Sequence, residues 1–556
     1  MHKAFSFTRL ITGITTVLSG CFLLFLAAAS LVSTCTIRGD YLETTFFISS
    51  SVLPKIFLLC LCTFLLCVPR IRKFLLSEDI THPSHHRMIL ITVLFILSAC
   101  WALFTQPTVI SDQAEIQLAA EQLNYGDFSC IREGGYLARH HHQLGAILVS
   151  ALVQRIAGRD NYLVYQLINA LLCALSYLCL MRLSSSDGLG LKKPSLLFGA
   201  ALLFFPFLLY STFVYATIPA FFLSLLSFER ILAYEKSPSL TTAAVAGLSM
   251  ALAIFLKQNS LIFLIAAVVF SLLRVLRSGV SRLLLPVSLI LFSALFMVLP
   301  KVLFERVTGH SIPDGISPLC YLTMGVQDSD RAPGWYNSYV NSVYGESGTA
   351  PEIQKETALR DYSERLRYFR AHPQDAVRFF VQKTASQWNN PTFESLWINQ
   401  VRGSNIRPAD WIRRLVRPTG ADFLTKILNP IQFLLLFLAF LSLFRMPENA
   451  LSTTFLLLVT FVGGFLFHSF WEAKCQYTLP YMVLLLPFSV RGLETAAALV
   501  ASPRNFLHSL SGTGRFLLLF SLILLPVLAL WLSHSGFLTC DNAAYAEYLR
   551  QVRAAG

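Results

Sequence analysis

Two acidic residues, Asp112 and Glu115, follow the end of a long apolar segment, within the sequence Val-Ile-Ser-Asp-Gln-Ala-Glu at residues 109–115. A three-residue spacing places both carboxylates on one face if this stretch is helical. A carboxylate held at such a boundary can act as a general base on an acceptor hydroxyl. The same two residues could instead solvate a loop or cap a helix.

A second polar cluster lies at residues 134–145, with the sequence Gly-Gly-Tyr-Leu-Ala-Arg-His-His-His-Gln-Leu-Gly. The two glycines permit a tight loop or the close approach of a ligand. Arg139 and the three histidines concentrate hydrogen-bond donors, which suits a phosphate group. A metal site is the rival interpretation, although adjacent histidines rarely ligate one ion. A solvated turn is the third interpretation.

Three further clusters combine charge, amides and aromatic rings. Residues 257–259, Lys-Gln-Asn, interrupt two apolar runs, and Lys257 could pair with a phosphate or extend along a helix end to reach water. Residues 334–337 and 388–397 join tryptophan and tyrosine to asparagine, which suits a sugar ring, or an aromatic belt at a membrane surface. Glu472 and Lys474 follow another apolar run.

The composition identifies the elements that must position these residues. Of 556 residues, 55% are hydrophobic and 13% are charged, whereas soluble proteins carry about 25% charged residues. This excludes an ordinary soluble enzyme, a disordered chain and a small disulfide-rich secreted domain. Long apolar runs predict an all-α polytopic membrane protein. The net charge of +13 is then explained by basic cytoplasmic loops rather than by nucleic acid binding.

Thirteen membrane spans are predicted from the apolar runs. They are 11–36, 51–69, 88–106, 162–181, 194–210, 212–233, 239–257, 259–273, 283–300, 427–444, 451–468, 477–490 and 516–533. Basic residues in alternate loops place 37–50, 107–142, 301–426, 469–476 and the C-terminal tail outside the cytoplasm. We expect 143–157 to be half-inserted or to lie at the interface. Short amphipathic helices are expected over 350–383.

Four parts of the chain follow from this pattern. Residues 1–87 form an extra N-terminal transmembrane hairpin and a cytoplasmic loop. Residues 88–300 form a membrane core that carries a first extracytoplasmic loop. Residues 301–426 form a large extracytoplasmic loop with short helices, and 427–556 form C-terminal membrane helices and a tail. The polar clusters fall at helix ends on one face, which favours surface chemistry on a lipid-linked substrate over transport.

The motifs resemble the GT-C superfamily of polytopic glycosyltransferases, specifically bacterial membrane proteins related to the family 39 protein mannosyltransferases. The resemblance covers the chain from about residue 88 onward. Residues 134–145 resemble a family segment of the type GGYL-x-x-YPHQLG, with His142 and Gln143 keeping its His-Gln pair. The chain departs from the family at Gln476, where an arginine is usual, and after Tyr215, where relatives often carry an acid.

The resemblance implies an inverting transfer, outside the cytoplasm, of a sugar from a polyprenyl-phosphate donor to a glycan, lipid or protein acceptor. It implies that Asp112 is the catalytic base and that Glu115 orients the acceptor or Asp112. The expected contacts to the donor phosphate or substrate are Arg139, His142, Gln143, Lys257, Asn259, Trp335, Tyr336, Asn337, Glu472 and Lys474.

The resemblance implies no cofactor, and we see no convincing metal site in the sequence. It also indicates a multi-pass protein of a bacterial plasma membrane, with a small flippase and a cytoplasmic sugar–lipid synthase as candidate upstream partners. Two alternatives stay open. The chain could be a transporter or flippase of a lipid-linked saccharide, or a non-catalytic envelope-assembly protein that has kept the fold.

Overall fold

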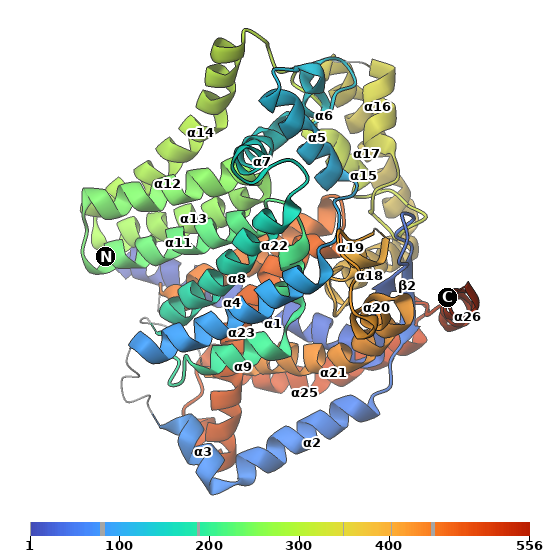
Figure 1. The fold of residues 1–556 in the computed structure, drawn as a ribbon. Helices are drawn as coiled ribbons and strands as arrows, with labels where there is room; N and C mark the ends of the chain where they lie inside the picture. The colour runs from blue at the N-terminus through green and yellow to red at the C-terminus, as the bar shows by residue number, and fades with distance from the viewer. Residues whose placement is uncertain are drawn as a thin grey trace.

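The computed structural model describes residues 2–77, 84–185, 189–347, 350–401, 403–445 and 451–555. The described chain is mostly helical, which confirms the predicted all-α polytopic class (Figure 1). Within these residues, ten candidate spans are long and apolar enough to cross a membrane. The helices that carry them are α1 (His2–Val32), α4 (Ser84–Thr105), α8 (Tyr162–Ser185), α11 (Thr217–Lys236), α13 (Leu261–Ser278), α14 (Leu284–Thr308), α21 (Pro418–Ser442), α22 (Thr453–Phe470), α23 (Cys475–Ala501) and α25 (Gly512–His534).

The predicted count of thirteen spans is not confirmed, because three expected spans differ in the described residues. The stretch 194–210 divides into α9 (Leu196–Leu203) and α10 (Pro206–Leu209), where proline begins a new helix because it has no N–H to continue the old one. The stretch 239–257 is α12 (Leu240–Leu256), an apolar helix of only 17 residues. The stretch 51–69 is α2 (Leu53–Cys67), which bends by 85° into α3 (Pro69–Leu76).

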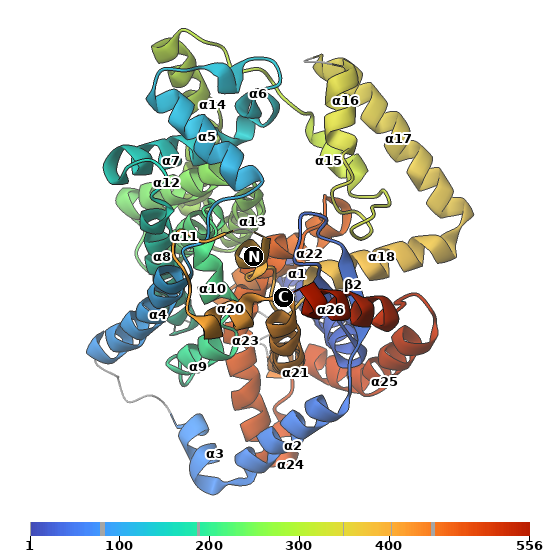
Figure 2. The same ribbon diagram turned by 45° about the vertical axis from the view of Figure 1, so that its right-hand side comes forward.

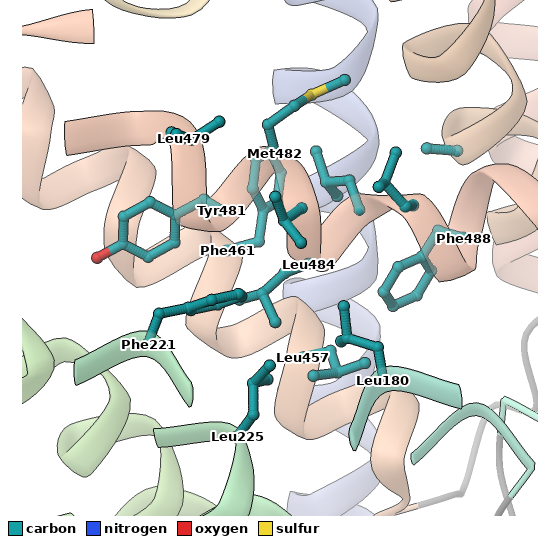
Figure 3. Close-up of a cluster of buried hydrophobic side chains, with 14 of the residues drawn as sticks. Leu180, Phe221, Leu225, Leu457, Phe461, Leu479, Tyr481, Met482, Leu484 and Phe488 are labelled. Carbon is teal, nitrogen blue, oxygen red and sulfur yellow. The ribbon is translucent and has the colours of Figure 1, made fainter. Parts of the chain in front are cut away.

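The membrane helices pack around an apolar core that lies beneath the polar clusters. Figure 3 shows part of this core, where side chains of α8, α11, α22 and α23 meet. A Cβ atom on Gly464 would lie 2.3 Å from the Tyr481 ring, so the glycine lets α22 and α23 approach closely. Tyr481 also stacks on Phe263 of α13, with ring centroids 5.7 Å apart. This packing fixes the outer ends of α11, α13 and α23 relative to one another.

The N-terminal part contains a feature that the sequence did not predict. The expected exterior loop 37–50 belongs to a β-hairpin, in which β1 (Ser33–Ile37) pairs antiparallel with β2 (Thr45–Ser49). Its β-branched and aromatic residues favour strands once a partner surface is available. That surface is α26 (Asn542–Ala555), which lies beside β2 (Figure 2) and stacks Tyr548 on Phe46 with centroids 5.5 Å apart.

The two long polar segments are also helical, and each has helices at the same end of the molecule. The first holds α5 (Asp112–Asn124) and α6 (Tyr136–Arg139), and the apolar helix α7 (Leu144–Ala157) follows it. The second holds α15 (Pro318–Met324), α16 (Tyr339–Ser347), α17 (Pro351–Ala371), α18 (Pro373–Trp388), α19 (Trp397–Val401) and α20 (Asp410–Val416). In both ribbon views α5 and α6 share this end with α15 and α16, whereas α3 lies at the opposite end (Figures 1 and 2). The helices predicted over 350–383 are thus present, but as two long helices.

Candidate active site

Asp112 and Glu115 lie in the first turn of α5, where carboxylates are favoured by the helix dipole. The opposite face of α5 is anchored, because Gln113 Oε1 accepts a hydrogen bond from the backbone N–H of Val214 at 2.8 Å. Both acids are exposed on the other face. The residue before them, Ser111, has φ 53° and ψ −136°, a backbone conformation that is costly for a serine. Such strain is concentrated at functional sites, which makes this turn a candidate.

The two acids line a cavity of about 480 Å³, a volume suited to a small ligand. Every residue predicted for the site lines this cavity except Asn337. The amide of Asn337 instead donates to Gln327 Oε1 and to the backbone oxygen of Asp328, both at 3.1 Å. The prediction that Asn337 contacts substrate therefore gains no support, because its side chain is used to hold its own loop together.

The histidine segment forms one wall of the cavity. It runs from α6 into a turn of 3₁₀ helix over His141–Gln143. His140 Nδ1 lies 3.0 Å from the Tyr321 hydroxyl, and Gln143 Nε2 donates to the Tyr215 hydroxyl at 2.9 Å. Burial lowers the pKa of His142 to about 3, and neighbouring cations add to this effect. His142 is therefore neutral at physiological pH, so it can offer a hydrogen bond to a phosphate but no charge.

Lys257 lies at the break between α12 and α13 and faces the cavity rather than open water. Its ammonium nitrogen lies 4.1 Å from the Tyr215 ring centroid and 5.5 Å from that of Tyr477. Burial lowers the pKa of Lys257 to about 8, although the carboxylates of Asp112 and Glu472 oppose the shift. An enclosed cation of this kind interacts strongly with a bound anion.

The segment between α22 and α23 supplies another part of the cavity wall. Lys474 Nζ lies 2.9 Å from Glu43 Oε1, and the guanidinium group of Arg331 pairs with the other oxygen of the same carboxylate. Burial raises the pKa of Glu472 to about 7; the charge of Lys474 opposes this rise and that of Asp112 adds to it. The cavity thus holds carboxyl groups in different environments, which is how acid and base roles are separated in enzymes.

A narrow apolar cleft of about 30 Å³ adjoins the polar cavity. Its apolar part is lined by residues of α11, α13 and α23, namely Thr217, Ala220, Phe221, Phe263, Pro480 and Tyr481. Lys257, Asn259, Gln476 and Tyr477 line both the cleft and the cavity. The arrangement therefore places the Lys257 ammonium group where the polar cavity meets a small apolar recess.

Several cavity residues were missed by the sequence analysis. They are Tyr41, Glu43, Tyr321, Arg331 and Asn341, which lie outside the segments singled out in the sequence. Glu43 lies in the segment 37–50, which the sequence predicts to be extracytoplasmic, but a lone acid in a short loop carries no signal of its own. Among the described residues, no group of three or more His, Cys, Asp or Glu side chains is placed to hold a metal ion.

A comparison with solved structures finds distant matches. An oligosaccharyltransferase from Archaeoglobus fulgidus, tethered with an acceptor peptide, aligns over 84% of this chain and 59% of its own, at 13% identity and a TM-score of 0.40. ArnT from Cupriavidus metallidurans, bound to undecaprenyl phosphate, aligns over 75% of this chain and 78% of its own, at 12% identity and a TM-score of 0.29. Arabinosyltransferase EmbB from Mycobacterium smegmatis aligns over 91% of this chain and 46% of its own, at 14% identity and a TM-score of 0.31.

The chain thus spans about three fifths of the length of the archaeal oligosaccharyltransferase. No protein-family model matches the chain, and no curated protein sequence matches it. All three matches lie at 14% identity or less and at a TM-score of 0.40 or less. At this level of similarity, the function has to be inferred from the cavity itself.

Proposed function

We propose that this chain is a membrane glycosyltransferase of the GT-C type, which transfers a sugar from a polyprenyl-phosphate donor to an extracytoplasmic acceptor. The observation that carries the proposal is the union of a polar cavity and an apolar cleft at Lys257. A free sugar phosphate would need no cleft, and a plain lipid would need no wall of carboxylates and amides. A lipid-linked sugar phosphate uses both.

The donor is oriented by this union. In this proposal its phosphate lies against Lys257 and Asn259, with Arg139 in the same cavity, and its first isoprene unit lies beside Phe221 and Phe263 at the cleft. The sugar then occupies the main cavity between the α5 turn and the segment that carries Glu472. Tyrosine rings and amides around this space suit a sugar, because they combine flat apolar faces with hydrogen-bonding groups.

The transfer is a single displacement with inversion. The acceptor hydroxyl oxygen attacks the anomeric carbon while the bond from that carbon to the phosphate oxygen breaks, and the bonding electron pair leaves with the phosphate. Asp112 accepts the proton of the acceptor hydroxyl, and Glu115, on the same face of α5, orients that hydroxyl. Lys257 and Arg139 stabilise the charge that develops on the departing phosphate.

The wider setting belongs to the same proposal. The cavity opens on the extracytoplasmic face of a bacterial cell membrane, the acceptor is an envelope glycan, a lipid or a protein, and a small flippase and a cytoplasmic sugar–lipid synthase deliver the donor. No cofactor takes part. A transporter would place its charged groups within its helices, whereas the groups that line this cavity come mainly from helix ends and connecting segments.

The test is sugar transfer by the purified protein in lipid vesicles, using a panel of polyprenyl-phosphate monosaccharides and crude envelope acceptor. Asp112→Asn should lower turnover at least about a hundredfold, as expected for loss of a positioned general base. Glu121→Gln is the matched control, since Glu121 lies on the same helix but pairs with Arg159 outside the cavity, at 2.7 Å. Equal activity of wild type and Asp112→Asn would refute the role of Asp112, and transfer from no donor would favour the transporter or the assembly protein.

A further inference from the structure

The N-terminal β-hairpin inserts one carboxylate into the wall of the cavity. Glu43 lies in the connection between β1 and β2, and its side chain is only 4% exposed. Its φ of 50° is unusual for a residue with a side chain, so the surroundings must hold the backbone in this conformation. A buried charge is costly unless it is paired, and this one is paired twice.

The two partners of Glu43 come from separate parts of the chain. Lys474 lies in the segment before α23, with its Nζ 2.9 Å from Glu43 Oε1, and Arg331 lies in the loop between α15 and α16. Each cation also lies over an aromatic ring of the cavity wall. Lys474 is 5.3 Å from the Trp397 centroid, and Arg331 is 5.2 Å from that of Tyr336. One carboxylate therefore joins the hairpin to two cations of the cavity.

Backbone contacts keep the hairpin in register with these partners. The N–H of Thr45 donates to the Arg331 carbonyl at 2.9 Å, and the N–H of Cys35 donates to the Asn389 carbonyl at 3.0 Å. The Trp397 indole donates to the Asp40 carbonyl at 3.1 Å. On the other side, the N–H of Gly39 donates to the Tyr548 hydroxyl at 3.0 Å, so α26 supports the same connection. The position of the Glu43 carboxylate is thus set by the fold around it.

We propose that Glu43 is a positioning residue, which holds Lys474 and Arg331 in place on the wall that faces the transferred sugar, so that the N-terminal hairpin is an integral part of the active site. The inference rests on the proposed glycosyl transfer. Without Glu43, two cations would remain side by side in a partly desolvated wall and would repel each other. With it, both have fixed directions toward the cavity.

The charges around Lys474 support this role. Burial acts to lower the pKa of Lys474, but the carboxylates of Glu43 and Glu394 outweigh it and raise the pKa above its ordinary value, against the repulsion of Arg331. The charge of Lys474 is felt in turn by Glu472, two residues before it, and by Lys257. Loss of the Glu43 carboxylate should therefore leave Lys474 both displaced and more easily deprotonated.

The first experiment measures kcat/KM for the donor identified above in a double-mutant cycle. Glu43→Gln and Lys474→Gln should each lower kcat/KM about tenfold, within the range found for coupled charges. The double variant should be no more than about threefold worse than Lys474→Gln, because Glu43 acts through that lysine. Losses that simply multiply would overturn the proposal.

Two variants on the hairpin separate positioning from folding. Asp40→Asn is the matched control, because the Asp40 carboxylate pairs with Arg38 on the same hairpin, outside the cavity, and the amide keeps the acceptor that Leu42 uses. Its kcat/KM should stay at the wild-type value. Glu43→Asp keeps the charge but is too short to reach both cations, so its activity should lie between wild type and Glu43→Gln. Wild-type activity in both Glu43 variants would overturn the proposal.

A second experiment needs no sugar transfer. Acetic anhydride labels lysine only in its neutral form, and mass spectrometry gives the rate at Lys474 relative to Lys355, an exposed reference on α17. The relative rate at pH 9 should rise at least about fivefold in Glu43→Gln, since a pKa fall of one unit exposes about ten times more free amine. If that variant does not fold, Glu43→Asp should still raise the rate at least about twofold.

The two experiments keep this inference separate from the proposed function. Unchanged labelling of Lys474 in the Glu43 variants, together with normal transfer, would overturn the positioning role and leave the glycosyltransferase intact. If the wild type transfers no sugar but Lys474 is labelled faster in Glu43→Gln, the proposed function is refuted. The effect of the Glu43 ion pair on Lys474 is then still supported.

Discussion

The two charged walls of the cavity are built in opposite ways. On the wall formed by α5, the histidine segment and Lys257, the charges stand apart: among the described residues, Asp112, Arg139 and Lys257 form no ion pair, and Arg139 Nε is buried with no hydrogen-bond partner. On the other wall, Glu43 pairs with both Lys474 and Arg331. Uncommitted charges are free to meet a substrate, whereas paired charges are fixed in place. The first wall is therefore suited to contacting the reacting groups, and the second wall to holding the shape of the cavity.

The largest difference between the walls should appear on removal of one cation from each. Lys257→Met should lower kcat/KM at least about a hundredfold, because Lys257 stabilises the developing charge of the phosphate directly. Lys474→Met should lower kcat/KM only about tenfold, because Lys474 is already paired with Glu43. Steady-state kinetics of both variants on one donor checks this order. Equal losses would remove the distinction between the two walls.

The apolar cleft offers a second way to sharpen the comparison, since Lys257 lines it and Lys474 does not. Phe221→Ala should raise KM about tenfold for a long-chain polyprenyl donor, because burial of the lost aromatic surface contributes roughly 1.5 to 3 kcal/mol. The effect should vanish for a donor whose phosphate carries no isoprene unit. The matched control is Phe228→Ala, two turns further along α11. Phe228 is buried in the core and does not line the cleft. A chain-length-independent effect would contradict the orientation of the donor.

The pH dependence of transfer should report the uncommitted cation. The pKa of Lys257 is lowered to about 8, so the lysine loses its positive charge as pH rises through that value and kcat/KM should fall there. Ionisation of Glu472, whose pKa is raised to about 7, adds negative charge in the same range and acts in the same direction. Lys257→Arg keeps its charge, so its decline should begin at least about one pH unit higher. An unchanged profile in that variant would exclude Lys257 as the titrating group.

The smallest effect is expected at Asn337, which the sequence placed in the site and the structure places outside the cavity wall. Asn337→Ala should change kcat/KM less than about threefold, because it removes contacts within the loop at residues 327–337 and none to substrate. Trp335→Phe provides the contrast, since the Trp335 indole lines the cavity and donates to Ser386 Oγ at 2.8 Å. A large loss at Asn337 with none at Trp335 would reverse the assignment.

The first wall could be predicted from the sequence far better than the second. Asp112, the 134–145 segment and Lys257 stand out because each interrupts or borders an apolar run, and polar residues there are costly without a function. Glu43 and Arg331 give no such signal, since both lie in polar loops. They form an ion pair only when the fold brings the hairpin against the loop before α16. Local patterns find helices and their ends, but they do not find contacts between distant segments. The broken stretch at 194–210 was missed because hydropathy does not register the effect of Pro206.

The most direct test of the whole account is a structure of the protein in a lipid nanodisc with bound polyprenyl phosphate, determined by electron cryomicroscopy. The account predicts that the phosphate lies within hydrogen-bonding distance of Lys257 and that the isoprenoid chain follows Phe221 and Phe263 between α11 and α13. Lys474 should keep its pairing with Glu43 in this complex. A phosphate bound at Lys474 in place of Glu43, or a lipid seated outside the cavity, would contradict it.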